Sequence, residues 1–74
     1  MSNTDPSAVE KLTPSQKEIL IAIAEDLTPK EIAARLGIGV NIVEFHRACI
    51  KQLIGAKGPA GIARYAIRAG LIQP

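Results

Sequence analysis

The chain has 74 residues and a formal net charge of +2 at pH 7, and 47% of its residues are hydrophobic but only 3% are aromatic. A chain of this length holds one core, and a domain this small buries only about 60% of its unfolded surface, so we expect it to dimerise. A core that is rich in aliphatic and poor in aromatic residues favours packed helices. The composition therefore predicts a small all-α domain that associates with a second subunit.

Several classes of protein are disfavoured by what the chain lacks. The longest apolar run covers residues 19–24, which is much shorter than the roughly 20 residues that span a bilayer. The N-terminus lacks the basic and apolar regions of a secretory signal, so we expect a cytoplasmic protein with no membrane partner. One cysteine and one histidine make neither an internal disulfide nor a zinc site. We therefore expect no metal, no cofactor and no enzymatic activity.

The N-terminal segment, residues 1–11, is polar and contains proline and several small residues. This composition predicts a flexible tail. The remaining residues, 12–74, show apolar periodicity from end to end, with neither an internal repeat nor a low-complexity tract. We therefore expect a single domain over residues 12–74.

The first predicted helix opens on a capping box. Thr13 stands three residues before Gln16, and the proline between them occupies the first helical position. Apolar residues then recur at spacings of three and four, which is typical of an amphipathic helix. We expect this helix to end near Glu25 or Asp26.

The same capping pattern recurs at Thr28 and Glu31 and opens a second helix. Gly37 is predicted to end that helix in the left-handed conformation, and Gly39 to cap the next one. Two short helices joined by a glycine-flanked turn, over residues 28–51, are typical of a helix-turn-helix. The second helix of such a unit usually lies in the major groove of DNA.

The third predicted helix begins at Val40 and ends at Leu53 or Ile54, before Gly55. Its helical periodicity separates an inner face from an outer face. The inner face is predicted to hold Val43, His46 or Arg47, Ile50, Leu53 and Ile54. The outer face is predicted to hold Asn41, Glu44, Phe45, Ala48, Lys51 and Gln52.

The last predicted helix runs from Pro59 to Ala69 and is followed by Gly70. Small and aliphatic residues on it offer a surface on which two subunits can approach closely. The residues predicted for this dimer interface are Ala60, Ile62, Ala63, Ala66 and Ile67. The predicted fold class is therefore all-α, with four helices and no strand.

Positive charge gathers in the C-terminal two thirds of the chain. Residues 1–26 carry two lysines against five acidic residues, whereas residues 27–74 carry seven cations against two acidic residues. A basic excess around the helix-turn-helix is what nucleic-acid binding requires, although merely solvated charges would give the same pattern. The residues expected to contact phosphates are Lys30, Arg47, Lys51 and Lys57.

These features together resemble the LuxR-type (GerE-like) helix-turn-helix domain of bacterial response regulators and quorum-sensing regulators. Matching positions run in order and without a gap over residues 12–72. They are Leu12-Thr13-Pro14, Glu18-Ile19-Leu20, Lys30-Glu31-Ile32-Ala33, Leu36, Ile38, Val43, His46-Arg47, Ile50, Gly55, Arg64-Tyr65-Ala66 and Gly70-Leu71-Ile72. The resemblance implies a four-helix domain whose fourth helix pairs two subunits on a twofold DNA site. It leaves open whether the chain stands alone or ends a longer regulator.

The third predicted helix departs from the pattern that this resemblance implies. Gly39 and Ile42 stand where the family has serine and threonine, and Glu44 stands where it has lysine or arginine. Phe45 replaces a small or polar residue, and Ala48 replaces a lysine that some members have. The face that should meet DNA has therefore lost charge and gained apolar area.

The leading hypothesis is a homodimeric bacterial transcriptional regulator that binds double-stranded DNA through the third predicted helix. The residues expected to face the bases are Asn41, Glu44, Phe45 and Ala48. Glu44 can accept a hydrogen bond from a cytosine amino group or remain solvated. Phe45 can touch a thymine methyl group, anchor a protein partner or pack against the second helix. His46 is expected to pack beneath the helix and to bond a backbone group.

The competing hypothesis is a protein-interaction module derived from the same fold. In this version Ile42, Glu44 and Phe45 dock onto another transcription regulator, and the chain has little or no DNA binding of its own. The loss of hydroxyl groups and positive charge from the third predicted helix motivates it. A sigma-factor-like helix-turn-helix that binds promoter DNA and polymerase is a third alternative.

Overall fold

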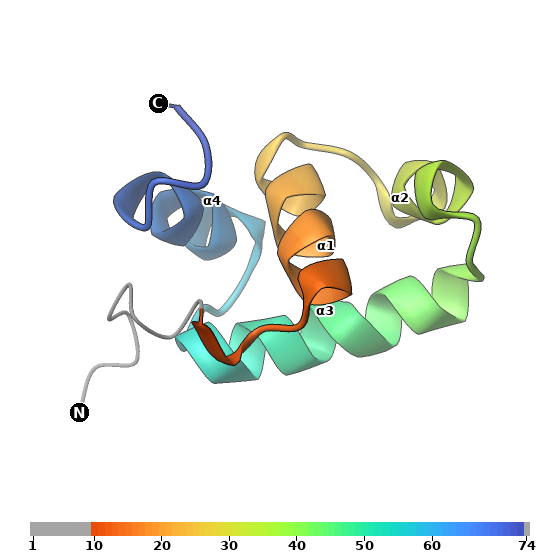
Figure 1. Ribbon diagram of the computed structural model, residues 1–74, viewed down its shortest axis with the longest axis horizontal. Coiled ribbons are helices and arrows are strands. Elements are labelled where there is room, and N and C mark those ends of the chain that lie inside the picture. Colours follow the sequence, from red (N-terminus) through yellow and green to blue (C-terminus); the bar gives the residue numbers. More distant parts are fainter. Residues whose placement is uncertain (1–9, 74) are drawn as a thin grey trace.

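The computed structural model describes residues 10–73, which form four α-helices without a strand (Figure 1). The helices are α1 (Pro14–Ala24), α2 (Pro29–Leu36), α3 (Val40–Ile54) and α4 (Pro59–Arg68). The predicted all-α, four-helix fold is therefore confirmed. Most of the predicted flexible tail lies outside the described residues, and the part of it that is described, residues 10 and 11, forms a short turn.

The first helix, α1, lies at the centre of the arrangement. It packs against α3 and α4, while α2 packs mainly against α3, so that α4 and α2 lie at opposite ends of α3 (Figure 1). The side chains buried between these helices are almost all aliphatic, as the composition predicts. They are Leu12, Ile19, Leu20, Ala22, Ile23, Ile32, Ala33, Val43, Ile50, Ile54, Ile62, Tyr65 and Ala66.

Both predicted capping boxes are present. The Thr13 amide donates to Gln16 Oε1 at 3.1 Å, and the Gln16 amide donates to Thr13 Oγ1 at 3.1 Å. In the second box, the Thr28 amide donates to Glu31 Oε1 at 2.8 Å and the Glu31 amide donates to Thr28 Oγ1 at 3.2 Å. These bonds satisfy amides that have no partner inside the helix. The starts of α1 and α2 are thus determined by residues that are three positions apart.

The four described helices end in the same way, with a left-handed residue followed by an apolar residue that returns to the core. The left-handed residues are Asp26, Gly37, Gly55 and Gly70. In each case the next amide donates to a carbonyl five residues earlier, as in a Schellman motif. These bonds are Leu27 to Ala22, Ile38 to Ala33, Ala56 to Lys51 and Leu71 to Ala66. The motif directs each connecting segment back towards the core.

The helix ends differ from their predicted positions by one or two residues in two places. The last residue of α1 is Ala24 rather than Glu25 or Asp26, and α4 ends at Arg68, with Ala69 as its C-cap. In α1, the left-handed Asp26 draws Glu25 out of the helical conformation, to ψ 10°. The helix therefore stops earlier than the apolar periodicity indicates.

We expect Asp26→Gly to stabilise the protein. Among the described residues, Asp26 is the non-glycine residue with a positive φ, at 71°, where a side chain crowds the backbone at a cost of about 1 kcal/mol. Glycine removes that cost but loosens the unfolded chain, so we expect a net gain of about 0.5 kcal/mol in the free energy of unfolding. Urea denaturation of the purified protein measures this quantity.

The matched control for this prediction is Glu25→Gly, because Glu25 is also exposed but has an ordinary φ of −87°. Glycine at that position relieves no crowding, and we expect it to lower the free energy of unfolding. Equal losses in the two variants would show that Asp26 is not strained.

Candidate nucleic-acid interface

The α2–turn–α3 unit holds α3 with one side inside the core and the other side free. On the inner side, Val43, Ile50 and Ile54 are fully buried. In the turn, Ile38 lies partly buried against the core, and its amide bonds the Ala33 carbonyl at 3.1 Å. This anchoring determines the rotation of α3 about its own axis. The outward side chains of α3 are therefore presented on a rigid element.

The residues predicted to face the bases, Asn41, Glu44, Phe45 and Ala48, are all exposed on α3. Phe45 is 63% exposed, so its ring does not pack against α2 as one alternative expected. Asn41 folds back over the start of the helix, where its Oδ1 lies 2.6 Å from the position that a Cβ on Gly39 would take. The outer face is thus available in the protomer, and its first turn carries a polar amide.

One edge of this face is charged, and we call Glu44, Arg47 and Lys51 the charged flank. Arg47 Nη1 lies 3.5 Å from Glu44 Oε1, and the two side chains are 29% and 51% exposed. A solvent-exposed pair at this distance contributes at most about 1 kcal/mol. Lys51 is half-buried. The pair between Arg47 and Glu44 therefore contributes little to the stability of the fold.

Arg47 also connects α3 to the start of α2. It lines a hollow of about 150 Å³ together with Thr28 and Pro29, next to the exposed Lys30. The fourth predicted phosphate contact, Lys57, is exposed on the loop between α3 and α4. The four cations thus divide between the start of α2, the middle of α3 and the loop that follows α3.

The opposite edge of the outer face is apolar, and we call Ile42, Phe45 and Cys49 the apolar flank. Their spacing of three and four residues puts them side by side on the helix surface. Ile42 is 42% exposed and Cys49 is half-buried. Cys49 borders a shallow hollow that it shares with Gln16 of α1. The outer face of α3 therefore has two chemically different edges.

A side-chain hydrogen bond joins α1 to α3 beneath the apolar flank. Gln16 Nε2 lies 3.2 Å from His46 Nδ1. Because the Thr13 amide can only donate, the Gln16 atom that faces it is the oxygen, and the Gln16 amino group therefore donates to His46. The expected bond from His46 to a backbone group is wrong, since its partner is this side chain. The rings of His46 and Phe45 are in turn in a T-shaped arrangement, with their centroids 5.5 Å apart.

The prediction for the dimer interface needs a correction. Ile62 and Ala66 are fully buried inside the protomer, because the apolar side of α4 packs against α1. They are not available to a second subunit. The remaining predicted residues lie on the other side of α4, where Ala60 and Ile67 are exposed and Ala63 is half-buried.

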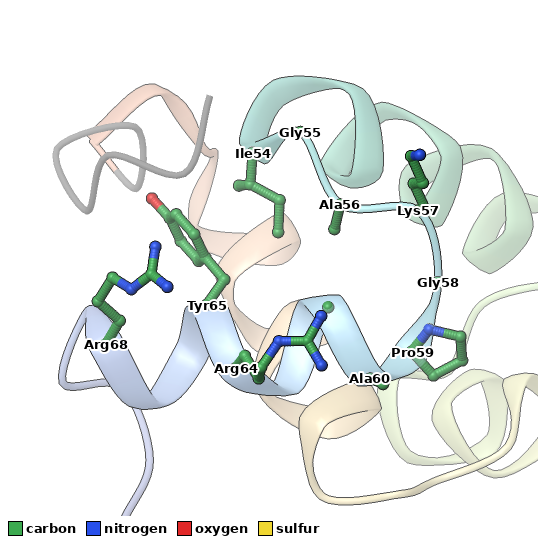
Figure 2. A pocket seen from close by; sticks show the side chains of 11 residues that line it. Ile54, Gly55, Ala56, Lys57, Gly58, Pro59, Ala60, Arg64, Tyr65 and Arg68 are labelled. Carbon is green, nitrogen blue, oxygen red and sulfur yellow. The ribbon is translucent and has the colours of Figure 1, made fainter. Parts of the chain in front are cut away.

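The loop between α3 and α4 borders a cavity of about 430 Å³ (Figure 2). Lys57, Arg64 and Arg68 line it, and none of the described residues around it is acidic. Arg64 folds back along α4, since its Nη2 lies 3.9 Å from the position that a Cβ on Gly61 would take. Arg64 was not among the cations expected to contact phosphates. The signal that could have identified Arg64 is its position three residues after Gly61, because the missing side chain of that glycine leaves room for the guanidinium group.

The described residues offer no grouping typical of a catalytic or metal site. Within residues 10–73 no charged side chain is buried, and His, Cys and acidic residues do not gather in groups of three. Within the same range, no helix is long and apolar enough to cross a lipid bilayer.

Comparison with known proteins identifies the type of domain. The family model described as bacterial regulatory proteins, luxR family, matches residues 10–66. The chain is 38% identical over 64 residues to the transcriptional regulatory protein MctR of Rhizobium johnstonii. The aligned segment covers 86% of the chain and 30% of that relative. It is 33% identical over 72 residues to the oxygen regulatory protein NreC of Staphylococcus aureus, which covers 97% of the chain and 32% of that relative. The chain thus spans about a third of the length of these relatives. No solved structure matches it.

We expect Gln16 and His46 to be energetically coupled. Replacing either by alanine breaks the bond between them, so the two single losses should sum to more than the loss in the double variant. A hydrogen bond of this kind corresponds to a coupling of about 0.5–1.5 kcal/mol. Urea denaturation of Gln16→Ala, His46→Ala and the double variant measures it. A parallel cycle between Gln16 and Gln52, which line the same hollow without a bond, should give no coupling. If both cycles give the same value, the bond does not join α1 to α3 in solution.

Proposed function

The chain belongs to the luxR family of bacterial regulatory proteins, and we propose on that basis that it binds double-stranded DNA as a homodimeric transcriptional regulator. The family places the domain among those that serve DNA-binding transcription regulation. The observation that carries the proposal is the outer face of α3, which is exposed along a helix whose inner side is fully buried. The major groove is about 12 Å wide and accepts one α-helix. In this proposal α3 lies in that groove.

Phosphate contacts orient the domain on the duplex. Lys30, Arg47, Lys51 and Lys57 flank the outer face of α3 on three different segments of the chain. Cations spread in this way can reach phosphates on both sides of the groove that holds the helix. Arg47 exchanges Glu44 for a phosphate as DNA approaches, because its exposed pair with Glu44 is weak.

Base contacts come from the exposed centre of α3. Asn41 has the amide geometry that pairs with the N6 and N7 atoms of adenine, and Glu44 accepts from the N4 amino group of cytosine. Ala48 contributes little bulk, which lets the helix approach the base edges closely. Asn41 and Glu44 are one turn apart at most, so they read neighbouring base pairs.

Dimerisation through α4 supplies the second half-site. The exposed residues Ala60 and Ile67, together with the half-buried Ala63, form the surface that meets the twofold-related subunit. Two subunits double the number of phosphate contacts, which compensates for the small number of cations on each. The proposed operator is therefore a twofold-symmetric sequence with half-sites about one helical turn apart.

The second candidate function is the protein-interaction module, and the exposure of Ile42 and Phe45 favours it. The double variant Glu44→Lys with Phe45→Thr separates the two candidates. If the chain is a DNA-binding regulator, this variant loses sequence-specific binding. If it is an interaction module, the same variant gains affinity for DNA and loses its protein partner.

We expect the affinity for DNA to fall steeply as salt concentration rises. With four phosphate-contacting cations on each of two subunits, the slope of log K against log salt should be about −7. Replacing Lys57 by alanine should make the slope less negative by about two, one for each subunit. Fluorescence anisotropy with labelled duplex over a series of salt concentrations measures the slope. Lys17→Ala on α1 is the control and should leave it unchanged. A salt-independent affinity would contradict phosphate-led binding.

We expect Ile67→Glu to convert the dimer to a monomer and to weaken DNA binding. Ile67 is exposed in the protomer, so the charge disrupts the subunit contact without disturbing the core. Analytical ultracentrifugation measures the change in mass, and circular dichroism checks that the helices persist. Ser15→Glu adds the same charge at an exposed position of α1 and should leave the dimer intact. A wild-type protein that sediments as a monomer at high concentration would refute the assignment to α4.

A further inference from the structure

The apolar flank of α3 stands beside the residues of the outer face that are proposed to contact DNA bases. Ile42 and Phe45 are 42% and 63% exposed and are three residues apart, so their side chains are adjacent on the helix surface. They stand beside Asn41, Glu44 and Ala48, which are exposed on the same outer face. A pair of large apolar side chains in the centre of such a face gains free energy when an apolar group of similar size covers it.

Phe45 has an ordered neighbour on α3. Its ring and that of His46 are in a T-shaped arrangement with centroids 5.5 Å apart, and His46 in turn accepts a hydrogen bond from Gln16 on α1. The ring is therefore braced on one side by a chain of contacts that ends at the capping box of α1. A braced aromatic side chain loses little conformational freedom when it binds a ligand, so it suits a contact that discriminates between similar groups.

The major groove contains one apolar group that such a pair can recognise. Guanine, adenine and cytosine present only donors and acceptors there, whereas thymine adds its C5 methyl group. We propose that Ile42 and Phe45 together form a thymine-reading patch, which makes thymine methyl groups a determinant of sequence specificity. This inference rests on the proposed function, because it requires α3 to lie in the major groove.

The neighbouring polar residue agrees with this assignment. Asn41 precedes Phe45 by four residues, so the two side chains lie one above the other on the helix. Asparagine pairs best with adenine, whose complement is thymine. A base-pair step that offers adenine to Asn41 and a thymine methyl group to Phe45 therefore satisfies both side chains. The predicted half-site contains A·T pairs at its centre.

The apolar area of the patch matches a small group more closely than a whole protein surface. A standard protein–protein interface takes about 800 Å² from each partner, whereas burying one aromatic side chain removes about 150–250 Å². Within residues 41–52, which are all described, the exposed large apolar residues are Ile42 and Phe45. Two side chains fall well short of such an interface but match one or two methyl groups.

The test replaces thymine by uracil, which pairs identically and lacks only the C5 methyl group. The full chain first selects its preferred duplex from a random library. Each thymine of that duplex is then replaced by uracil in turn, and the dissociation constant is measured at fixed salt. We expect at least one thymine in each half-site whose replacement weakens binding about fourfold, which corresponds to about 0.8 kcal/mol for one methyl-sized group.

Two variants assign the effect to the patch. With Phe45→Ser and with Ile42→Ser, which leave no methyl group to contact thymine, the thymine and uracil duplexes should bind more nearly equally, and the double variant should no longer distinguish them. Asn41→Ala is the matched control on the same face, and it should weaken binding while keeping the preference for thymine. Both apolar side chains are exposed, so circular dichroism of the variants should match that of the wild type.

The possible failures are distinguishable. If the wild type selects a duplex but binds its uracil forms equally well at every position, the thymine-reading patch is wrong and the proposed DNA binding stands. If the preference for thymine persists in the double variant, the patch assignment is likewise wrong. If no duplex is selected from the library, the proposed function itself is wrong, and the patch is overturned with it.

Discussion

The burial of one stripe of α3 against α1 is the interaction on which the rest of the structure depends. Val43, Ile50 and Ile54 of α3 have no exposed surface, and the same holds for Ile19 and Leu20 of α1. Each such side chain contributes about 1.5–3 kcal/mol relative to an exposed position, which is large beside the total stability of a small domain. Because this stripe determines the rotation of α3, it also determines which side chains of α3 face outward.

The outward face that results is unusual for a DNA-binding helix. Its central residues, Phe45 and Ala48, carry no charge, and the single acidic residue on it, Glu44, stands opposite Arg47 at 3.5 Å. The positive charge lies at the edges, on Arg47 and Lys51 of the charged flank, on Lys30 before α3 and on Lys57 after it. In the proposed complex this division separates two tasks, since the edges would attract the phosphates and the centre would meet the bases. In that arrangement the chemistry of the centre would control specificity more than affinity.

The local features of the fold were largely predictable. A capping box depends on residues three positions apart, and a Schellman ending depends on one left-handed residue and its neighbours. For this reason the starts of α1 and α2 at Thr13 and Thr28, and the end of α2 at Gly37, agree with the sequence patterns. The early end of α1 was missed because Asp26, rather than glycine, occupies the left-handed position.

The residue pattern alone determined the fold class, the helix-turn-helix and the family resemblance, because all three depend on short-range spacing along the chain. The tertiary structure decided what depends on how the helices cross. Periodicity could not show that Ile62 and Ala66 are buried against α1. Nor could it show that His46 forms a hydrogen bond with Gln16, 30 residues earlier in the chain. The sequence pattern of an amphipathic helix shows that one side is apolar but does not show which neighbouring helix covers that side. That choice is made when α1 packs between α3 and α4, and it leaves Ile42 and Phe45, together with Val40 in the first turn, as exposed large apolar side chains of α3.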